Sequence, residues 1–342
     1  MRYPGCAALF RSWAAPMTSE IRPLPVIVLP GADESGPGYL LRVAQRNGLT
    51  LKGMLGWLGI SSLQTLTPFG IRRLAYATEA PHTWLRKSLV LWLRRERFQF
   101  AEGLGHRWSS ALGLRGARPQ VCPDCLRERG QCRASWEMTG EFGCLQHGRL
   151  LTDSCPHCGM PLTWMRAAVD VCACGRYLTA GSPTHSLNTD HVCWLELLGA
   201  RMASPEQVGL PLAETVPWLA HLSPDGAFTT VYAAGVRVHP SERIPLTSRV
   251  NPAPSTVAEI IDRGLQRLRD EAVGERSCSE SMRGLVYEQA LERLSTRGET
   301  EADRDIAGEL LAWVRTAPRH GLSLTGRRPL GQLDLFSTER PR

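Results

Sequence analysis

The sequence predicts a mainly α-helical protein with a small domain organised by two metal ions. Apolar residues recur at helical spacing in the N-terminal and C-terminal parts of the 342-residue chain. Between these parts, eight of the eleven cysteines lie from Cys122 to Cys174. Paired cysteines in a chain without an export signal are typical of metal ligands, because a reducing cytosol keeps thiols free.

Six segments are expected along the chain. They are a flexible N-terminus (1–24), a helical helix-turn-helix-like domain (25–118), a tandem two-zinc domain with short β-hairpins (119–180), a mixed connector of helices and loops (181–254), a helical domain (255–317) and a flexible tail (318–342).

The two ends of the chain carry further expectations. Nothing periodic begins before residue 25, so we hypothesise that Met17 rather than Met1 starts the protein. No apolar run approaches the ~20 residues that cross a bilayer, and Arg11 interrupts the N-terminal apolar patch before it reaches signal-peptide length. We therefore expect a soluble, cytoplasmic protein.

The N-terminal domain is expected to contain four short helices. Residues 38–48 and 50–60 each fit one, the second weakened by three glycines. Two more flank a break at 78–80, and the last of them is expected to run from Pro81 through Leu93. Such a pair is typical of a helix-turn-helix. A plain helical hairpin with a solvated basic face is the alternative, and alanine in place of the usual turn glycine counts against the first interpretation.

Basic residues concentrate around this helix pair. Residues 71–133 hold 13 Lys and Arg against 5 Asp and Glu, a net charge of +8. The second helix would direct polar and basic side chains toward a nucleic acid groove or a protein partner. The candidate DNA- or partner-binding residues are His82, Thr83, Arg86, Lys87, Arg94 and Arg95. All but two of the 40 basic residues are arginine, which suits bidentate phosphate or carboxylate contacts, although codon composition explains this bias equally well.

Five more helices are expected beyond the cysteine-rich region. Two short ones lie near 192–198 and 216–222, and three longer ones lie at about 257–272, 280–294 and 301–314. Capping boxes predict the starts of the first and third longer helices. The two boxes are Thr256 with Glu259 and Thr300 with Asp303.

Eight potential metal ligands form two sets of four. Structural zinc sites need four thiolate or imidazole ligands in a tetrahedron, and a C-x2-C turn supplies two thiolates without strain. Taken in chain order, the first set is Cys122, Cys125, Cys144 and His147, and the second is Cys155, Cys158, Cys172 and Cys174. An interleaved pairing of the same half-sites is the alternative. Two structural Zn²⁺ ions are therefore expected.

Residues around the ligands support this assignment. Pro123, Pro156, Gly159 and Gly175 fit knuckle turns whose amides point at sulfur. Cys132 has no partner at knuckle spacing and is expected to be a free thiol, while His157 is expected to point outward.

The same cluster argues against catalysis. Catalytic zinc keeps an open ligand position, whereas both sets are complete. The sequence has no H-E-x-x-H, no H-x-E of the zinc deaminases, and no phosphate-binding loop or nucleophile elbow. We expect a protein that is not an enzyme.

Several spaced motifs resemble the TniQ family of transposition proteins, which includes the TnsD-type target selectors. They are CPDCL at 122–126, Trp136, the core CLQHGRLLTDSCPHCG at 144–159, the closing cysteines 172 and 174, and DESGPGYLLRVAQRNG at 33–48. The resemblance covers about residues 25–200, and the short C-terminal part favours the compact TniQ type.

The resemblance implies a non-catalytic adaptor. Similar proteins connect target DNA, or a complex bound to the target, to an AAA+ ATPase that recruits a DDE transposase. An adaptor that docks an acidic protein partner without touching DNA is the second hypothesis, and a zinc-dependent nucleic-acid enzyme is a distant third. The oligomeric state is left open, with a homodimer as one alternative, as is a guide-RNA complex as partner.

Overall fold

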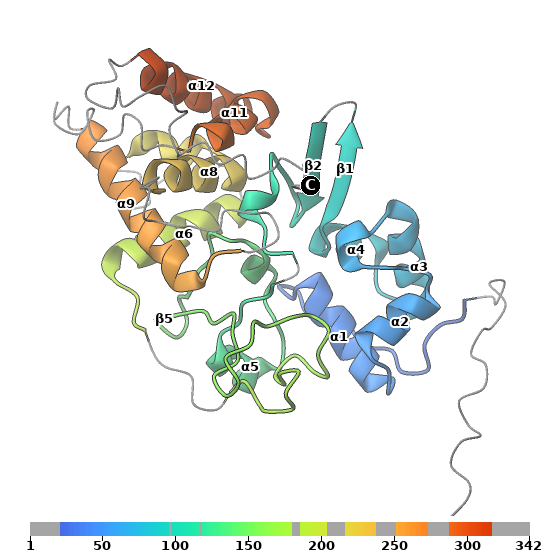
Figure 1. Cartoon of the computed structure of the whole chain (residues 1–342). Coiled ribbons are helices and arrows are strands. Elements are labelled where there is room, and N and C mark those ends of the chain that lie inside the picture. Colours follow the sequence, from blue (N-terminus) through green and yellow to red (C-terminus); the bar gives the residue numbers. More distant parts are fainter. Residues whose placement is uncertain are drawn as a thin grey trace, which may run out of the picture.

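The computed structural model describes residues 21–95, 98–116, 118–179, 185–203, 216–236, 251–272 and 287–316. In these residues helices dominate and the sheets are short and antiparallel (Figure 1), so the predicted mainly α class is confirmed. Residues 1–20 and the predicted tail at 318–342 lie outside the described residues, and so do Met1 and Met17. The division into domains remains a prediction.

Four helices and one 3-10 turn form the N-terminal part: α1 (Gly36–Arg46), α2 (Leu51–Trp57), η1 (Leu63–Thr65), α3 (Pro68–Thr78) and α4 (His82–Ser88). Three of these helices begin in the same way. Hydroxyl side chains at the N-cap accept a hydrogen bond from the amide of a glycine three residues on, which satisfies an otherwise unpaired helix donor. These N-caps are Ser35, Thr50 and Thr67.

The expected helix through Leu93 is wrong in its second half. α4 ends at Ser88, and the chain continues as strand β1 (Leu91–Arg95), which pairs with β2 (Phe98–Gly103), which pairs with β3 (His106–Trp108). The pairing is antiparallel, with Leu91 opposite Glu102. A short apolar run fits a helix and a buried strand equally well, and here the Val and Trp within it favour the strand.

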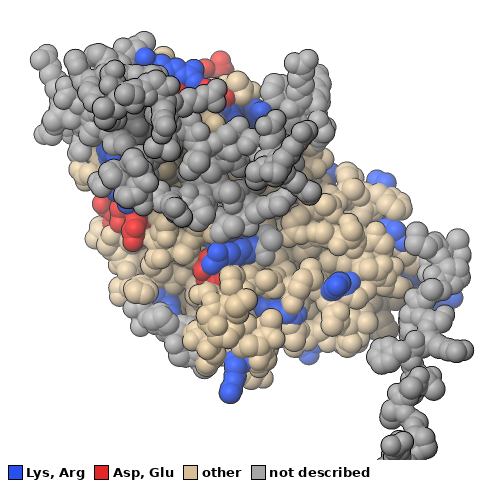
Figure 2. Space-filling view, in the orientation of Figure 1, with Lys and Arg blue, Asp and Glu red and all other residues tan. Residues whose placement is uncertain are grey.

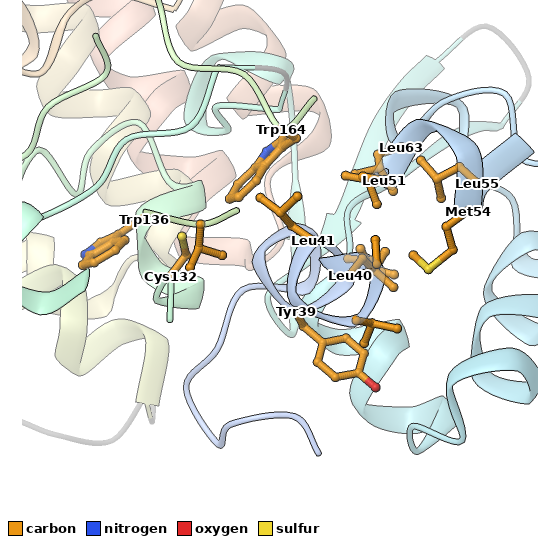
Figure 3. Close-up of a cluster of buried hydrophobic side chains, with 14 of the residues drawn as sticks. Tyr39, Leu40, Leu41, Leu51, Met54, Leu55, Leu63, Cys132, Trp136 and Trp164 are labelled. Atoms are coloured by element: carbon orange, nitrogen blue, oxygen red, sulfur yellow. The ribbon is translucent and has the colours of Figure 1, made fainter. Parts of the chain in front are cut away.

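The cysteine-rich region contains only short elements: η2 (Ala111–Gly113), α5 (Pro123–Arg129), η3 (Ala134–Glu137) and a hairpin of β4 (Gly143–Cys144) and β5 (Arg149–Leu150). Many of its apolar side chains join those of the N-terminal helices in one buried cluster, whereas Met138 and Phe142 belong to the cluster of the C-terminal helices. Figure 3 shows α1, with Tyr39, Leu40 and Leu41, between α2 and the side chains of Trp136 and Trp164.

The C-terminal helices surround a second buried cluster. They are α6 (Thr189–Ala203), η4 (Pro217–His221), α8 (Pro224–Gly235), α9 (Pro254–Ala272), α11 (Glu288–Arg297) and α12 (Glu301–Thr316). Every residue of α8 is buried, and this helix contacts α6, α9, α11 and α12 (Figure 1). In the view of Figure 2, basic side chains are spread over the part formed by α1 to α5, and most visible acidic ones lie near α9 and α12.

Most predicted C-terminal helices are confirmed. α6, α9 and α12 cover the expected ranges, residues 216–222 hold the 3-10 turn η4, and residues 280–286 lie outside the described residues. In the capping box of α12, Thr300 accepts from the amide of Asp303, and Asp303 accepts from the amide of Thr300. The box at Thr256 is wrong, because α9 already begins at Pro254, whose fixed φ suits the first helical position.

Two glycines allow α8 and α9 to touch backbone to backbone. A Cβ added to Gly235 would collide with the carbonyl oxygen of Ile260, and one added to Gly264 would collide with that of Val231. Side chains cannot relieve these collisions, since the obstructing atoms belong to the backbone.

Gly264→Ala is therefore expected to destabilise the protein by at least about 1–3 kcal/mol, because the two helices must separate. Urea unfolding followed by circular dichroism measures the change. Gly308→Ala in α12 is the matched control: an added Cβ there meets nothing within 4 Å, so stability should hold or rise. Equal stability of the two variants would contradict the close-packing argument.

Candidate metal centres

The first cluster is built by one helix and one hairpin. Cys122 is the N-cap of α5 and Cys125 lies in its first turn, while Cys144 ends β4 and His147 lies in the turn before β5. Their four ligand atoms all lie within 4.8 Å of one another. Gly148, with φ of +58°, allows the hairpin to turn sharply after the histidine.

The spacing of these atoms fits a tetrahedral zinc site. With Zn–S bonds of about 2.3 Å, the edge of a sulfur tetrahedron is about 3.8 Å, and an S–N edge is slightly shorter. The Sγ atoms of Cys125 and Cys144 are 3.6 Å apart, and His147 Nδ1 lies 3.3 Å from the first and 3.4 Å from the second. The geometry and the donor set therefore fit a zinc ion.

The second cluster is formed by loops. Cys155 and Cys158 flank one turn, and Cys172 and Cys174 flank another. The Sγ atoms are 3.8 Å apart in the pair Cys155–Cys174 and in the pair Cys158–Cys172, which is the tetrahedral edge expected around zinc. The structure thus groups the eight side chains in chain order, not in the interleaved pairing.

The knuckle turns have the predicted features. The amide of His157 points at the sulfur of Cys155, at 3.4 Å. Gly159 and Gly175 have φ of +69° and +83°, a conformation that residues with a side chain rarely adopt.

The close thiols of the first cluster shift one another's protonation. Hydrogen bonds from Cys122 and Cys125 lower the pKa of Cys144 to about 3, whereas hydrogen bonds with Cys122 and Cys144 raise the pKa of Cys125. The opposite shifts reflect the closeness of the thiols, because several thiolates at this distance repel one another. A divalent cation removes this conflict, since it stabilises all thiolates together.

Glu128 contacts the first cluster, and spacing alone does not reveal this contact. Its carboxylate lies 2.9 Å from Nε2 of His147, on the opposite side of the ring from the Nδ1 that faces the thiols. A carboxylate in this position fixes the ring orientation and makes the ligating nitrogen more basic. The sequence signal is an acidic residue on the helix that the first two cysteines begin.

Cys132 and His157 lie outside both clusters, as predicted. The thiol of Cys132 is buried against α1, and burial raises its pKa to about 12. Arg166, also buried, lies beside it. His157 is exposed, with Nε2 3.2 Å from the carbonyl oxygen of Tyr177.

The predicted binding residues of α4 are exposed. His82, Thr83, Arg86 and Lys87 all lie on its outer surface, but Arg86 forms an ion pair of 2.6 Å with Glu102 on β2. Arg94 and Arg95 belong to β1, and their side chains lie outside the described part of the chain. The turn between α3 and α4 forms without glycine because Glu79 itself takes a left-handed φ of +55°.

The motif at 33–48 has a structural explanation. Glu34 accepts two hydrogen bonds from the guanidinium of Arg42, at 2.6 and 2.7 Å, and one from the amide of Gly31. The side chain of Asn47 accepts a hydrogen bond from the backbone amide of Val26 and donates one to the carbonyl oxygen of the same residue. These residues therefore hold α1 and the segment before it in place.

The fold and the site together define a helical protein with two complete sets of four side chains that can hold metal ions. Residues 25–151 match the family model TniQ. The match covers 127 of the 342 residues, so this part of the chain carries a TniQ domain, which implies an accessory protein of transposition in general. The match spans the N-terminal helices and the first cluster and ends before the second.

Two further findings are negative. No curated protein is significantly similar to the chain. Among the described residues, none of the helices has the length and apolar character required to cross a membrane.

Cys144→Ser and Cys155→Ser are each expected to release the zinc of their own cluster and to lower the melting temperature, because three ligands hold the ion poorly. Metal content by mass spectrometry and thermal unfolding measure both effects. Cys132→Ala is the control and should keep two zinc ions per chain. A Cys144→Ser protein with two zinc ions and normal melting would show that the ligand assignment is wrong.

Glu128→Gln is expected to weaken zinc binding by about 10- to 100-fold, because the imidazole loses its carboxylate partner. Competition with a chromogenic chelator measures the affinity. Glu259→Gln, an exposed site on α9, is the matched control and should bind zinc as the unaltered protein does. Equal zinc affinities of the two variants would show that Glu128 does not support the metal site.

Proposed function

We propose that the protein is a zinc-stabilised, non-catalytic adaptor that connects target DNA, or a complex bound to it, to an AAA+ ATPase and through it to a DDE transposase. The observation that carries the proposal is the TniQ match over the N-terminal helices and the first cluster. Because those helices and the cysteine-rich region share one buried cluster, the metal would fix the surface that the helices present.

The chemistry of the clusters supports a structural role for the metal. Each set already supplies four thiolate or imidazole ligands, which complete the tetrahedron of zinc and leave no position for water or substrate. Five of the eight ligands are cysteines with at most 4% of their surface exposed, so substrate access to the metal is narrow. They are Cys122, Cys125, Cys144, Cys155 and Cys172.

The exposed basic face of α4 supports direct DNA contact. His82, Thr83 and Lys87 face solvent, and the helix follows α3 after a short turn. Arginine and lysine side chains on such a face bind phosphates, and each contact releases counterions.

One observation favours the alternative, an adaptor that docks a protein without DNA contact. Arg86 is already paired with Glu102, which lowers the positive charge that α4 offers to phosphates. An enzyme ranks last, and the test is cleavage of DNA or RNA by the purified protein with zinc.

Lys87→Ala is expected to weaken DNA binding and to reduce the slope of log affinity against log salt by about 1, because one phosphate contact is lost. Gel shifts at several salt concentrations measure both quantities. Glu102→Gln is the matched control: it frees Arg86 from its ion pair, so affinity should hold or rise. Salt-independent binding, or none, would favour the protein-docking alternative.

A further inference from the structure

In the second cluster, each exposed cysteine faces a buried one. Cys158 and Cys174 are exposed, whereas Cys155 and Cys172 have only 2% and 4% of their surface exposed. The Sγ atoms of Cys174 and Cys155 are 3.8 Å apart, and those of Cys158 and Cys172 are also 3.8 Å apart. The cluster therefore consists of two pairs of thiols, and in each pair solvent reaches one sulfur before the other.

The residues next to the exposed cysteines also face solvent. Met160 follows the first turn and is 64% exposed, and Tyr177 follows the second turn and is 60% exposed. His157, which directly precedes Cys158, is exposed as well. Both turns therefore lie at the surface of the described chain, where a small oxidant dissolved in water can reach Cys158 and Cys174.

The first cluster has close sulfurs but buried ones. The Sγ atoms of Cys125 and Cys144 are 3.6 Å apart, yet both residues, like Cys122, are at most 2% exposed. The partly exposed ligand of this cluster is His147, and an imidazole forms no disulfide. Because oxidation of a thiolate depends on its accessibility, exposure rather than distance makes the second cluster the more reactive of the two.

We propose that the second cluster is a redox-sensitive zinc centre, which hydrogen peroxide converts into two disulfides with release of the metal. With zinc bound, the four cysteines are thiolates, the form that reacts with peroxide. The exposed thiolate of a pair takes one oxygen atom from hydrogen peroxide and becomes a sulfenic acid, and hydroxide leaves. The buried thiolate then attacks the oxidised sulfur and expels a second hydroxide, which forms the disulfide. In each pair, two thiolates are oxidised and one hydrogen peroxide is reduced.

The sulfurs are placed for this reaction. Each pair must close from 3.8 Å to a bond of about 2.05 Å, so the two turns approach each other by less than about 2 Å. Both disulfides join one turn to the other, as the metal does, so the oxidised cluster keeps the turns together. A dithiol reverses the reaction, because it exchanges with a disulfide, whereas more highly oxidised sulfur is not recovered in this way.

The loop between the two turns, residues 159–171, connects this centre to the N-terminal helices. Trp164 on the loop belongs to the buried cluster that contains the apolar side chains of α1 (Figure 3). The indole of Trp164 also donates a hydrogen bond of 3.2 Å to the carbonyl oxygen of Gly116. A movement of the turns on oxidation would therefore act on the packing of α1 through this loop.

Treatment of the zinc-loaded full chain with hydrogen peroxide tests the proposal. A chromogenic chelator measures the released zinc, and mass spectrometry of peptides maps the disulfides. One zinc ion should leave at least about tenfold faster than the other, because solvent reaches only the second cluster. The disulfides Cys155–Cys174 and Cys158–Cys172 should form while the cysteines of the first cluster stay reduced. A dithiol followed by added zinc should restore two ions per chain.

Cys158→His/Cys174→His replaces both exposed thiols by imidazoles, which also bind zinc. This variant should keep two zinc ions and release the second at least about tenfold more slowly than the unaltered protein, and Cys132→Ala, the matched control, should respond as the unaltered protein does. Equal release of both ions, no release, or products other than these two disulfides would overturn the proposal. These outcomes are read on the unaltered chain, so they decide even if the histidine variant binds zinc poorly. The proposed adaptor function is tested separately, through Lys87.

Discussion

The mutual repulsion of closely held thiolates is the constraint on which the middle of this protein depends. Seven cysteine sulfurs and one imidazole are gathered in two groups, within each of which the ligand atoms lie within 4.8 Å of one another. The closeness of these thiols lowers the pKa of Cys144 and raises the pKa of Cys125, and a divalent cation would stabilise all the thiolates together. In a region built of two-residue strands, short 3-10 turns and the seven-residue α5, bound metal would add to the buried apolar contacts that hold this conformation.

This constraint extends to the N-terminal helices through α1. A Cβ added to Gly38 would come within 2.9 Å of the side chain of Cys132, so the helix and the cysteine-rich loop touch directly. The amide of Ser35, the N-cap of α1, also donates to the carbonyl of Cys132. Displacement of the loop would therefore disturb both the start of α1 and the apolar cluster behind it.

A buried polar network lies at the same junction. Arg115 binds Asp153 at 2.8 Å and the carbonyl of Pro252 at 3.0 Å, which joins the cysteine-rich region to the start of α9. Burial raises the pKa of Glu137 to about 8, although a hydrogen bond from Ser35 and the charge of Arg115 oppose the shift. These buried hydrogen bonds form only at short, fixed distances. They therefore hold the cysteine-rich region and the start of α9 in one arrangement.

Local chemistry could be predicted from the sequence, and contacts between distant segments could not. The eight ligands follow from spacing, because a C-x2-C turn is determined by the residues within it, whereas the choice between chain-order and interleaved pairing depends on which half-sites meet in space. The strand β1 is not predicted, because its apolar run fits the period of a helix as well as that of a strand. Pairing with β2 decides for the strand. The contact of Glu128 with His147 depends on how α5 meets the β4–β5 hairpin, and the exposure of Phe69 and Tyr76 on α3 depends on which side of that helix the core covers.

The two candidate metal centres differ in the solvent exposure of their cysteine ligands. In the first cluster all three cysteines are at most 2% exposed, and they belong to the apolar cluster shared with α1. In the second cluster, Cys158 and Cys174 are exposed. Solvent, oxidants and chelators reach exposed thiolates first, so the second centre is expected to lose its ligands to oxidation or chelation before the first. Loss of the second centre would still disturb the N-terminal helices, because Trp164, on the loop between its cysteine pairs, belongs to the same buried cluster.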